Sequence, residues 1–182
     1  NNSSQTWMAM TMLDSNRAKS MLAKKLSCNV SEIKKMIIWG NHSPTMFPDF
    51  ENALKDNRSV ASLIEDTNWI DSHFIPNVQQ RGKAVIDARG ASSATSAAKA
   101  ALDTVIACEN ETSSDDCFSA AVYSDGAYGV PEGIMCGFPL MTTPSGEIEI
   151  IRDFTLSDSA RSRLNLSIDE LLSEREAVKD LL

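Results

Sequence analysis

The residues best suited to chemistry are one histidine and, upstream of it, one aspartate and one arginine. His42 follows the apolar run Met36–Trp39, and only Gly40 and Asn41 separate them. Large apolar residues in a row are typical of a strand covered on both faces, and glycine and asparagine form turns. We therefore expect a buried strand over 36–39 with His42 at its exit. A histidine held there is a candidate for proton transfer, although a histidine beside apolar residues is also often structural.

Asp14 and Arg17 are three residues apart at the start of a helical pattern, so both side chains can project from one helix face. The carboxylate of Asp14 could hold an imidazole in one tautomer and favour its protonated form. The guanidinium of Arg17 could bind a substrate carboxylate through two hydrogen bonds. The alternative is that Asp14 caps the helix and Arg17 forms a surface ion pair. His42 favours the chemical interpretation, which is a proton-transfer site that binds a carboxylic acid.

Prolines mark expected breaks in the elements that follow His42. We interpret 43–49, which holds two prolines, as a loop leading away from the site, and 50–57 as a small hairpin or helical turn. Pro76 should kink or split a long helix near Ile75, because proline has no N–H to donate. Apolar periodicity predicts helices over 16–26 and 60–64 and from Thr67 onward, with a helical turn at 31–33.

Alanine and serine dominate the segment from Gly90 to Ala101, which we expect to be a helix continuing to Cys108. Small side chains allow a helix to approach another surface closely. That surface could be the flat ring of a ligand, or equally another helix or subunit.

The last third of the chain has a different pattern of apolar residues. Three short apolar or alternating runs separated by turn residues predict an antiparallel meander over 118–123, 134–140 and 146–152. We expect two helices to follow, the first over 157–164 and the second opened at Ser167 by a capping box with Glu170. Helices, then a meander, then helices indicate an α+β fold, an antiparallel sheet packed with helices, and not a doubly wound one.

Composition bounds the class of protein. At 182 residues with 42% hydrophobic content, the chain suits one domain. A net charge of −8 argues against nucleic acid and anionic membranes as partners. The four cysteines lack metal-ligand spacing, so we expect no metal and free thiols in a reducing compartment, the cytoplasm. We find no signal-peptide pattern and no membrane-length apolar run, and residues 1–6 look like a polar leader.

Four motifs, in order, resemble the cytosolic-type malate dehydrogenases of the lactate/malate dehydrogenase superfamily. The resemblance extends from about Met8 to Leu182. The motifs are LDSNRA at 13–18, WGNHS at 39–43, RGASSA at 89–94, and VYSDG followed by YGVP at 122–131.

The resemblance implies a role for each matching residue. His42 would be the catalytic general acid/base, Asp14 its partner, and Arg17 the arginine that binds the substrate carboxylate. Ser93 would lie near the substrate and, by a weaker match, Ser92 near the nicotinamide. It also implies NAD as cofactor, with NADP open, a small 2-hydroxy or 2-keto acid substrate, and a homodimer.

The nucleotide-binding half of such enzymes is not found in the 182 residues. The eight glycines stand at 40, 82, 90, 126, 129, 133, 137 and 146, and no three of them form the G-x-G-x-x-G fingerprint of a Rossmann domain. We therefore expect residues 1–182 to be the catalytic C-terminal domain alone. Two functions stay open: malate (or lactate) oxidation, and a catalytically silent domain that only folds and self-associates.

Overall fold

The buried run before His42 is strand β2 (Ile37–Trp39) in the computed structural model, which describes residues 7–181. All three β2 side chains are fully buried, as the sequence predicted. The predicted polar leader at 1–6 lies outside the described residues. β2 pairs antiparallel with β3 (Phe47–Asp49), with Ile38 opposite Pro48. The prediction of a loop over 43–49 is therefore wrong at its end, because an edge strand tolerates a proline that donates no hydrogen bond.

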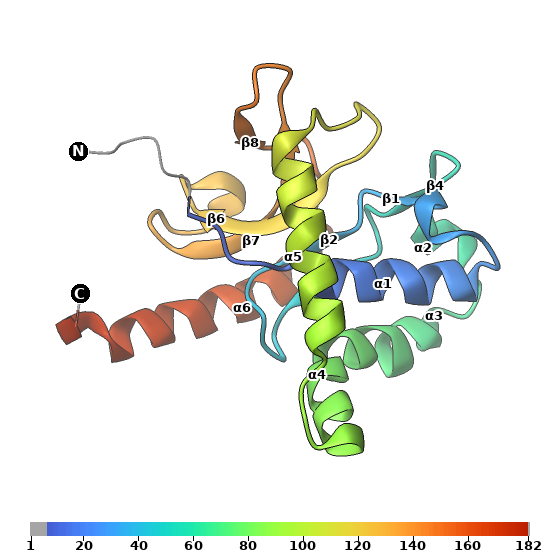
Figure 1. Ribbon diagram of the computed structural model, residues 1–182, viewed down its shortest axis with the longest axis horizontal. Coiled ribbons are helices and arrows are strands. Elements are labelled where there is room, and N and C mark those ends of the chain that lie inside the picture. The colour runs from blue at the N-terminus through green and yellow to red at the C-terminus, as the bar shows by residue number, and fades with distance from the viewer. Residues whose placement is uncertain (1–6, 182) are drawn as a thin grey trace.

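Two further sheets are antiparallel throughout (Figure 1). The predicted meander is confirmed as the larger sheet, with strand order β6-β7-β8. The segment 50–57, interpreted as a hairpin or a helical turn, contains the first strand of a hairpin between β4 (Leu54–Lys55) and β5 (Arg58–Ser59), in the smaller sheet of order β1-β4-β5. The α+β prediction is thus confirmed. The strands are β1 (Ile33–Lys34), β4 (Leu54–Lys55), β5 (Arg58–Ser59), β6 (Phe118–Tyr123), β7 (Met135–Thr142) and β8 (Ile148–Ile150).

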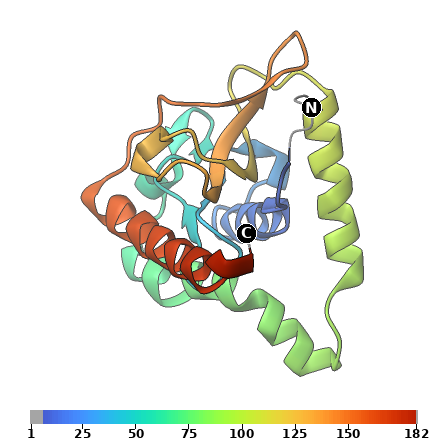
Figure 2. The ribbon, with the colours of Figure 1, turned by 90° about the vertical axis from the view of Figure 1, so that its left-hand side faces the viewer.

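Helices surround these sheets, and α5 (Ala94–Glu109) runs along one side of the body (Figure 2), where it contacts α1 (Met12–Lys25) and β7. A π-helical segment, Ile70–Phe74, directly precedes α4, and Pro76 lies in the first turn of α4. The predicted interruption at this proline is confirmed. No helix within residues 7–181 is long and apolar enough to cross a membrane. The α-helices are α1 (Met12–Lys25), α2 (Val60–Leu63), α3 (Thr67–Trp69), α4 (Ile75–Arg89), α5 (Ala94–Glu109) and α6 (Asp158–Ala177).

The C-terminal helix differs from its prediction. α6 is one continuous helix of 20 residues, and Ser157 caps it by accepting a hydrogen bond from the backbone N–H of Ala160. Ser167 lies in its middle and caps nothing. A buried stripe that includes Leu164 and Ile168 continues past Ser167, so packing against the body keeps the helix unbroken.

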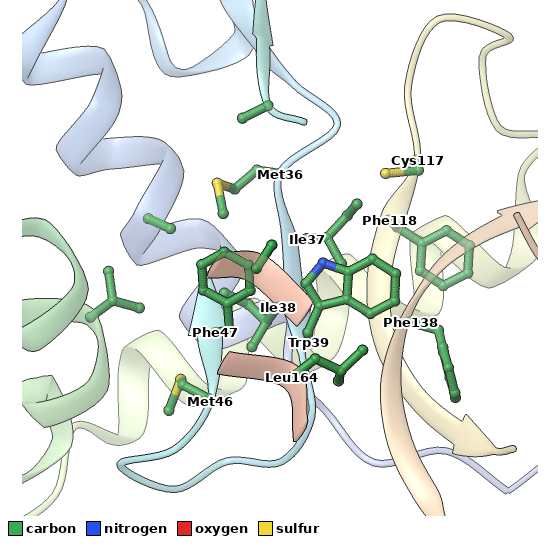
Figure 3. Close-up of a cluster of buried hydrophobic side chains, with 14 of the residues drawn as sticks. Met36, Ile37, Ile38, Trp39, Met46, Phe47, Cys117, Phe118, Phe138 and Leu164 are labelled. Carbon is green, nitrogen blue, oxygen red and sulfur yellow. The ribbon is translucent and has the colours of Figure 1, made fainter. Parts of the chain in front are cut away.

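The core is centred on β2, whose side chains meet those of β3, β6, β7 and α6 (Figure 3). The indole N–H of Trp39 donates a hydrogen bond of 2.8 Å to Asp49, which is also fully buried. Burial raises the pKa of Asp49, while hydrogen bonds from Trp39 and Asn52 act in the opposite direction. This contact joins β2 to β3 and fixes the start of the segment that carries His42.

Gly40, directly after β2, is the point where three elements meet. Its backbone carbonyl accepts a hydrogen bond of 2.6 Å from the N–H of Gly137 in β7. Its φ is +88°, and a Cβ atom at this position would lie 1.9 Å from the hydroxyl oxygen of Ser167 on α6. Both the backbone conformation and the space available therefore require glycine.

Gly40→Ala should lower the free energy of unfolding by about 3 kcal/mol, because it combines an unfavourable left-handed backbone with overpacking against α6. Gly146→Ala is the matched control: its φ is also positive (+84°), but nothing lies within 4 Å of an added Cβ. The control should lose only about 1 kcal/mol, the backbone cost alone. Urea unfolding of both variants measures the difference, and equal losses would contradict the steric argument.

Candidate active site

The carboxylate of Asp14 joins the three residues that the sequence singled out. Asp14 lies in the first turn of α1 and its side chain is fully buried. One oxygen accepts a hydrogen bond of 3.0 Å from Nη1 of Arg17, and the other lies 2.5 Å from Nδ1 of His42. The structure therefore brings His42, Asp14 and Arg17 into one cluster.

The alternative interpretation, in which Asp14 caps the helix and Arg17 forms a surface ion pair, does not describe their surroundings. α1 begins at Met12, four residues before the predicted start, so Asp14 lies inside the helix and Thr11 occupies the capping position. The Arg17 side chain is only 16% exposed, so its ion pair with Asp14 is not a surface pair. A partly buried guanidinium with one N–H engaged keeps further donors for a ligand.

His42 is more open than its partners, with 56% of its side chain exposed. The hydrogen bond to Asp14 raises the pKa of His42, and this outweighs burial and the charge of Arg17, which both lower it. With Nδ1 directed at Asp14, Nε2 is the nitrogen left to exchange a proton with a ligand. The arrangement can hold or release a proton near neutral pH beside a group that binds carboxylates.

The turn that carries His42 is bonded to α6. The hydroxyl of Ser43 donates a hydrogen bond of 2.7 Å to the carboxylate of Glu170, and the hydroxyl of Thr45 also bonds that carboxylate. The backbone N–H of Asn41 donates to the hydroxyl of Ser167 at 3.1 Å. Sequence reasoning missed this contact because it assigned Ser167 and Glu170 to a helix cap. The continuing apolar stripe of Leu164 and Ile168 was the signal that both lie within a helix.

Ser92 and Ser93 lie between α4 and α5, apart from this cluster. Ser92 is exposed, and the hydroxyl of Ser93 bonds that of Ser96 at 2.6 Å. Across residues 7–181, no hydrogen bond joins either serine to His42, Asp14 or Arg17. A cavity of about 720 Å³ between α1, α4 and α5 has both Arg17 and Ser96 in its lining. The assignment of Ser92 and Ser93 to substrate or nicotinamide remains a prediction.

The described residues do not form a dinucleotide site. Such sites lie at the carboxyl ends of parallel strands beside a glycine-rich turn, and every strand pair here is antiparallel. Within 7–181 there is also no group of three or more His, Cys, Asp or Glu side chains able to hold a metal ion. The cluster itself brings together an imidazole, a carboxylate and a guanidinium, groups that can transfer a proton and bind a carboxylate.

The structure thus combines an antiparallel α+β body with a His–Asp pair and an adjacent arginine. Residues 11–182 match the family described as the lactate/malate dehydrogenase, alpha/beta C-terminal domain. The chain belongs to this family. The oxidoreductase resemblance inferred from the four motifs is thus confirmed at the level of the family.

Solved structures agree with the family match. Malate dehydrogenase from Naegleria fowleri is 39% identical, with a TM-score of 0.88, over 96% of this chain and 53% of that one. Trichomonas vaginalis lactate dehydrogenase in complex with NADH and oxamate is 27% identical, with a TM-score of 0.88, over 95% and 54%. Malate dehydrogenase from Salinibacter ruber, at 23% identity, a TM-score of 0.77 and coverage of 95% and 56%, shows the shared fold. The chain spans about half the length of these proteins.

Asp14→Asn should lower the pKa of His42 to its ordinary value of 6.5 or below, because the remaining influences, burial and Arg17, both lower it. The raised pKa makes His42 stabilise the native protein fully below pH 6.5, and this stabilisation is lost as pH rises through the native pKa. Asp14→Asn should therefore not show this loss of stability as pH rises. NMR titration of the His42 ring, with urea unfolding on either side of the transition, measures both effects. A His42 pKa unchanged in Asp14→Asn would contradict the assignment.

Proposed function

We propose that this chain is the substrate domain of a 2-hydroxy acid dehydrogenase that interconverts malate and oxaloacetate. The observation that carries the proposal is the buried Asp14 carboxylate, which bonds Arg17 through one oxygen and His42 through the other. That geometry supports the proposal because a proton acceptor, His42, and a group able to bind carboxylates, Arg17, are bonded to the same anchor. A 2-hydroxy acid presents a hydroxyl and a carboxylate on neighbouring carbons, so it carries one group for each of them.

In the oxidation direction, neutral His42 takes the hydroxyl proton of the substrate at Nε2. Asp14 stabilises the resulting imidazolium through Nδ1, and Arg17 holds the substrate carboxylate so that the reacting carbon has one orientation. In the reduction direction, His42 starts protonated and donates to the keto oxygen. The raised pKa of His42 suits this second role near neutral pH.

The choice of malate over lactate is supported by the comparisons. The malate dehydrogenase from Naegleria fowleri is 39% identical to this chain, against 27% for the lactate dehydrogenase from Trichomonas vaginalis. Lactate and pyruvate stay as the alternative pair, since His42, Asp14 and Arg17 treat both acids alike at the end they contact.

NAD, or NADP, would accept the hydride and would be held by a nucleotide-binding domain outside these 182 residues. We propose a homodimer in the cytoplasm as the setting. Exposed apolar side chains on α5, namely Leu102, Val105 and Ile106, support self-association, and four cysteines without disulfides support a reducing compartment. The second candidate, a catalytically silent domain, is favoured by the lack of a dinucleotide site among residues 7–181.

An assay of NADH oxidation distinguishes the two candidate functions. It is run with oxaloacetate, and separately with pyruvate, on the purified chain and on a longer protein that includes a nucleotide-binding domain. His42→Asn should reduce turnover by at least a hundredfold, because the proton donor is lost. His73→Asn, which alters the chain's other histidine, is the control and should keep turnover. Near-normal turnover by His42→Asn would refute the catalytic role. No turnover by either protein would leave the silent domain.

Arg17→Lys should raise KM for the keto acid by about tenfold or more with a smaller change in kcat, because a point charge replaces a two-pronged donor. Steady-state kinetics measures the separation of KM from kcat. Arg58→Lys, the same exchange at an exposed position in β5, is the control. An unchanged KM in Arg17→Lys would count against substrate binding by Arg17.

A further inference from the structure

Helix α6 contacts the turn around His42 on both sides of the histidine. Ser167 bonds the backbone N–H of Asn41, before His42, and Glu170 bonds the hydroxyls of Ser43 and Thr45, after it. Ser167 and Glu170 are three residues apart, so they lie on one face of the helix. We propose that Ser167 and Glu170 are positioning residues that hold the 41–45 turn so that the His42 imidazole stays against Asp14.

Most polar groups of this contact are hydrogen-bonded, and the exception among residues 7–181 is the side-chain nitrogen of Asn41, which is buried without a partner. The hydroxyls of Ser43 and Thr45 each have one proton to donate, and the carboxylate of Glu170 accepts both. The hydroxyl of Ser167 accepts the N–H of Asn41 and donates to the Asn41 side-chain oxygen at 3.1 Å. The bonds from Ser43 and Thr45 lower the pKa of Glu170, so its acceptor is charged at neutral pH and the hydrogen bonds are of the stronger, charge-assisted kind.

The contact is also sterically tight. Ser167 is fully buried, and its side chain fills the space that a Cβ of Gly40 would need. The turn is held on its other flank by the backbone bridge between Gly40 and Gly137. A turn fixed on two flanks leaves the His42 side chain little freedom to swing away from Asp14, although more than half of that side chain is exposed.

The alternative is that Ser167 and Glu170 only fasten α6 to the body. Other residues already do so: Ala160, Leu164 and Ile168 are buried along the same helix. Removing Glu170 should therefore leave α6 in place and release the turn. Within residues 7–181, Glu170 makes no hydrogen bond to His42, so Glu170 can act on the imidazole only through the turn or through its charge.

The test is NMR titration of the His42 ring in Glu170→Ala. The charged groups that influence the ring are Asp14, which raises its pKa, and Arg17, which lowers it. A released turn weakens the bond to Asp14, so the pKa of His42 should fall, as in Asp14→Asn. The control is Glu174→Ala, which removes an exposed carboxylate one turn further along α6 and should leave the pKa unchanged. The protein has two histidines, so both rings can be followed.

A double variant separates positioning from a direct effect of charge. In the Asp14→Asn background, Glu170→Ala should produce no further shift, because the bond through which Glu170 acts is already absent. A shift of equal size in that background would overturn the proposal, as would an unchanged His42 pKa in the folded single variant. If Glu170→Ala fails to fold, Glu170→Gln and Ser43→Ala take its place, since each weakens the contact without deleting a large side chain.

This readout does not depend on the proposed dehydrogenase activity, so the two hypotheses can fail separately. In an active enzyme, Glu170→Ala should lower kcat by about tenfold to a hundredfold through misplacement of His42, with KM nearly unchanged because Arg17 is untouched. Glu170→Gln should recover part of that loss, because its amide oxygen still accepts a hydrogen bond. Equal falls in kcat for Glu170→Ala and Glu174→Ala would overturn the proposal.

Discussion

The buried carboxylate of Asp14 is the constraint on which the rest of the site depends. A carboxylate shielded from water is unfavourable unless it is paired and hydrogen-bonded, and here each oxygen has its own partner, Arg17 or His42. Both partners must reach the carboxylate at once, so the start of α1 and the end of β2 are held in a fixed position relative to each other. The rigidity that satisfies Asp14 also holds an imidazole and a guanidinium beside the same carboxylate.

The end of β2 is held by glycine and by α6 together. Gly40 has no side chain, so β7 and α6 approach it from two sides. Trp39, one residue earlier, is anchored by Asp49 and packs edge-on against Tyr128 with 4.7 Å between ring centroids. The segment before His42 is thus buried and bonded, while His42 itself is open. Burial thus changes within three residues, from the buried Trp39 to the open His42. The backbone that carries the imidazole is held in place while the imidazole itself stays accessible.

The described residues carry a His–Asp pair and an arginine but no dinucleotide site. Every strand pair among them is antiparallel, whereas a dinucleotide is bound in the crevice of a parallel sheet. In the dehydrogenase proposed above, dinucleotide binding would therefore belong to a separate domain, and the reaction would occur where the two domains meet. In that proposal the open side of His42 would face the nucleotide-binding domain, and the exposed apolar residues of α5 would face a second copy of the chain.

The sequence by itself singled out His42, Asp14 and Arg17 as candidates, but His42 and Asp14 are 28 residues apart and only the tertiary structure brings them together. It determined the elements that depend on local pattern: the buried strand before His42, the meander and the interruption at Pro76. These follow from periodicity, residue type and short spacings, which act between neighbours in the chain. Only the tertiary structure decided that Pro48 lies in a strand and that Ser167 and Glu170 serve the histidine turn. Ser167 and Asn41 are 126 residues apart, and a hydrogen bond over that separation depends on how α6 packs against β2, which no local pattern records. The serine that resembled the start of a helix therefore lies in the middle of one.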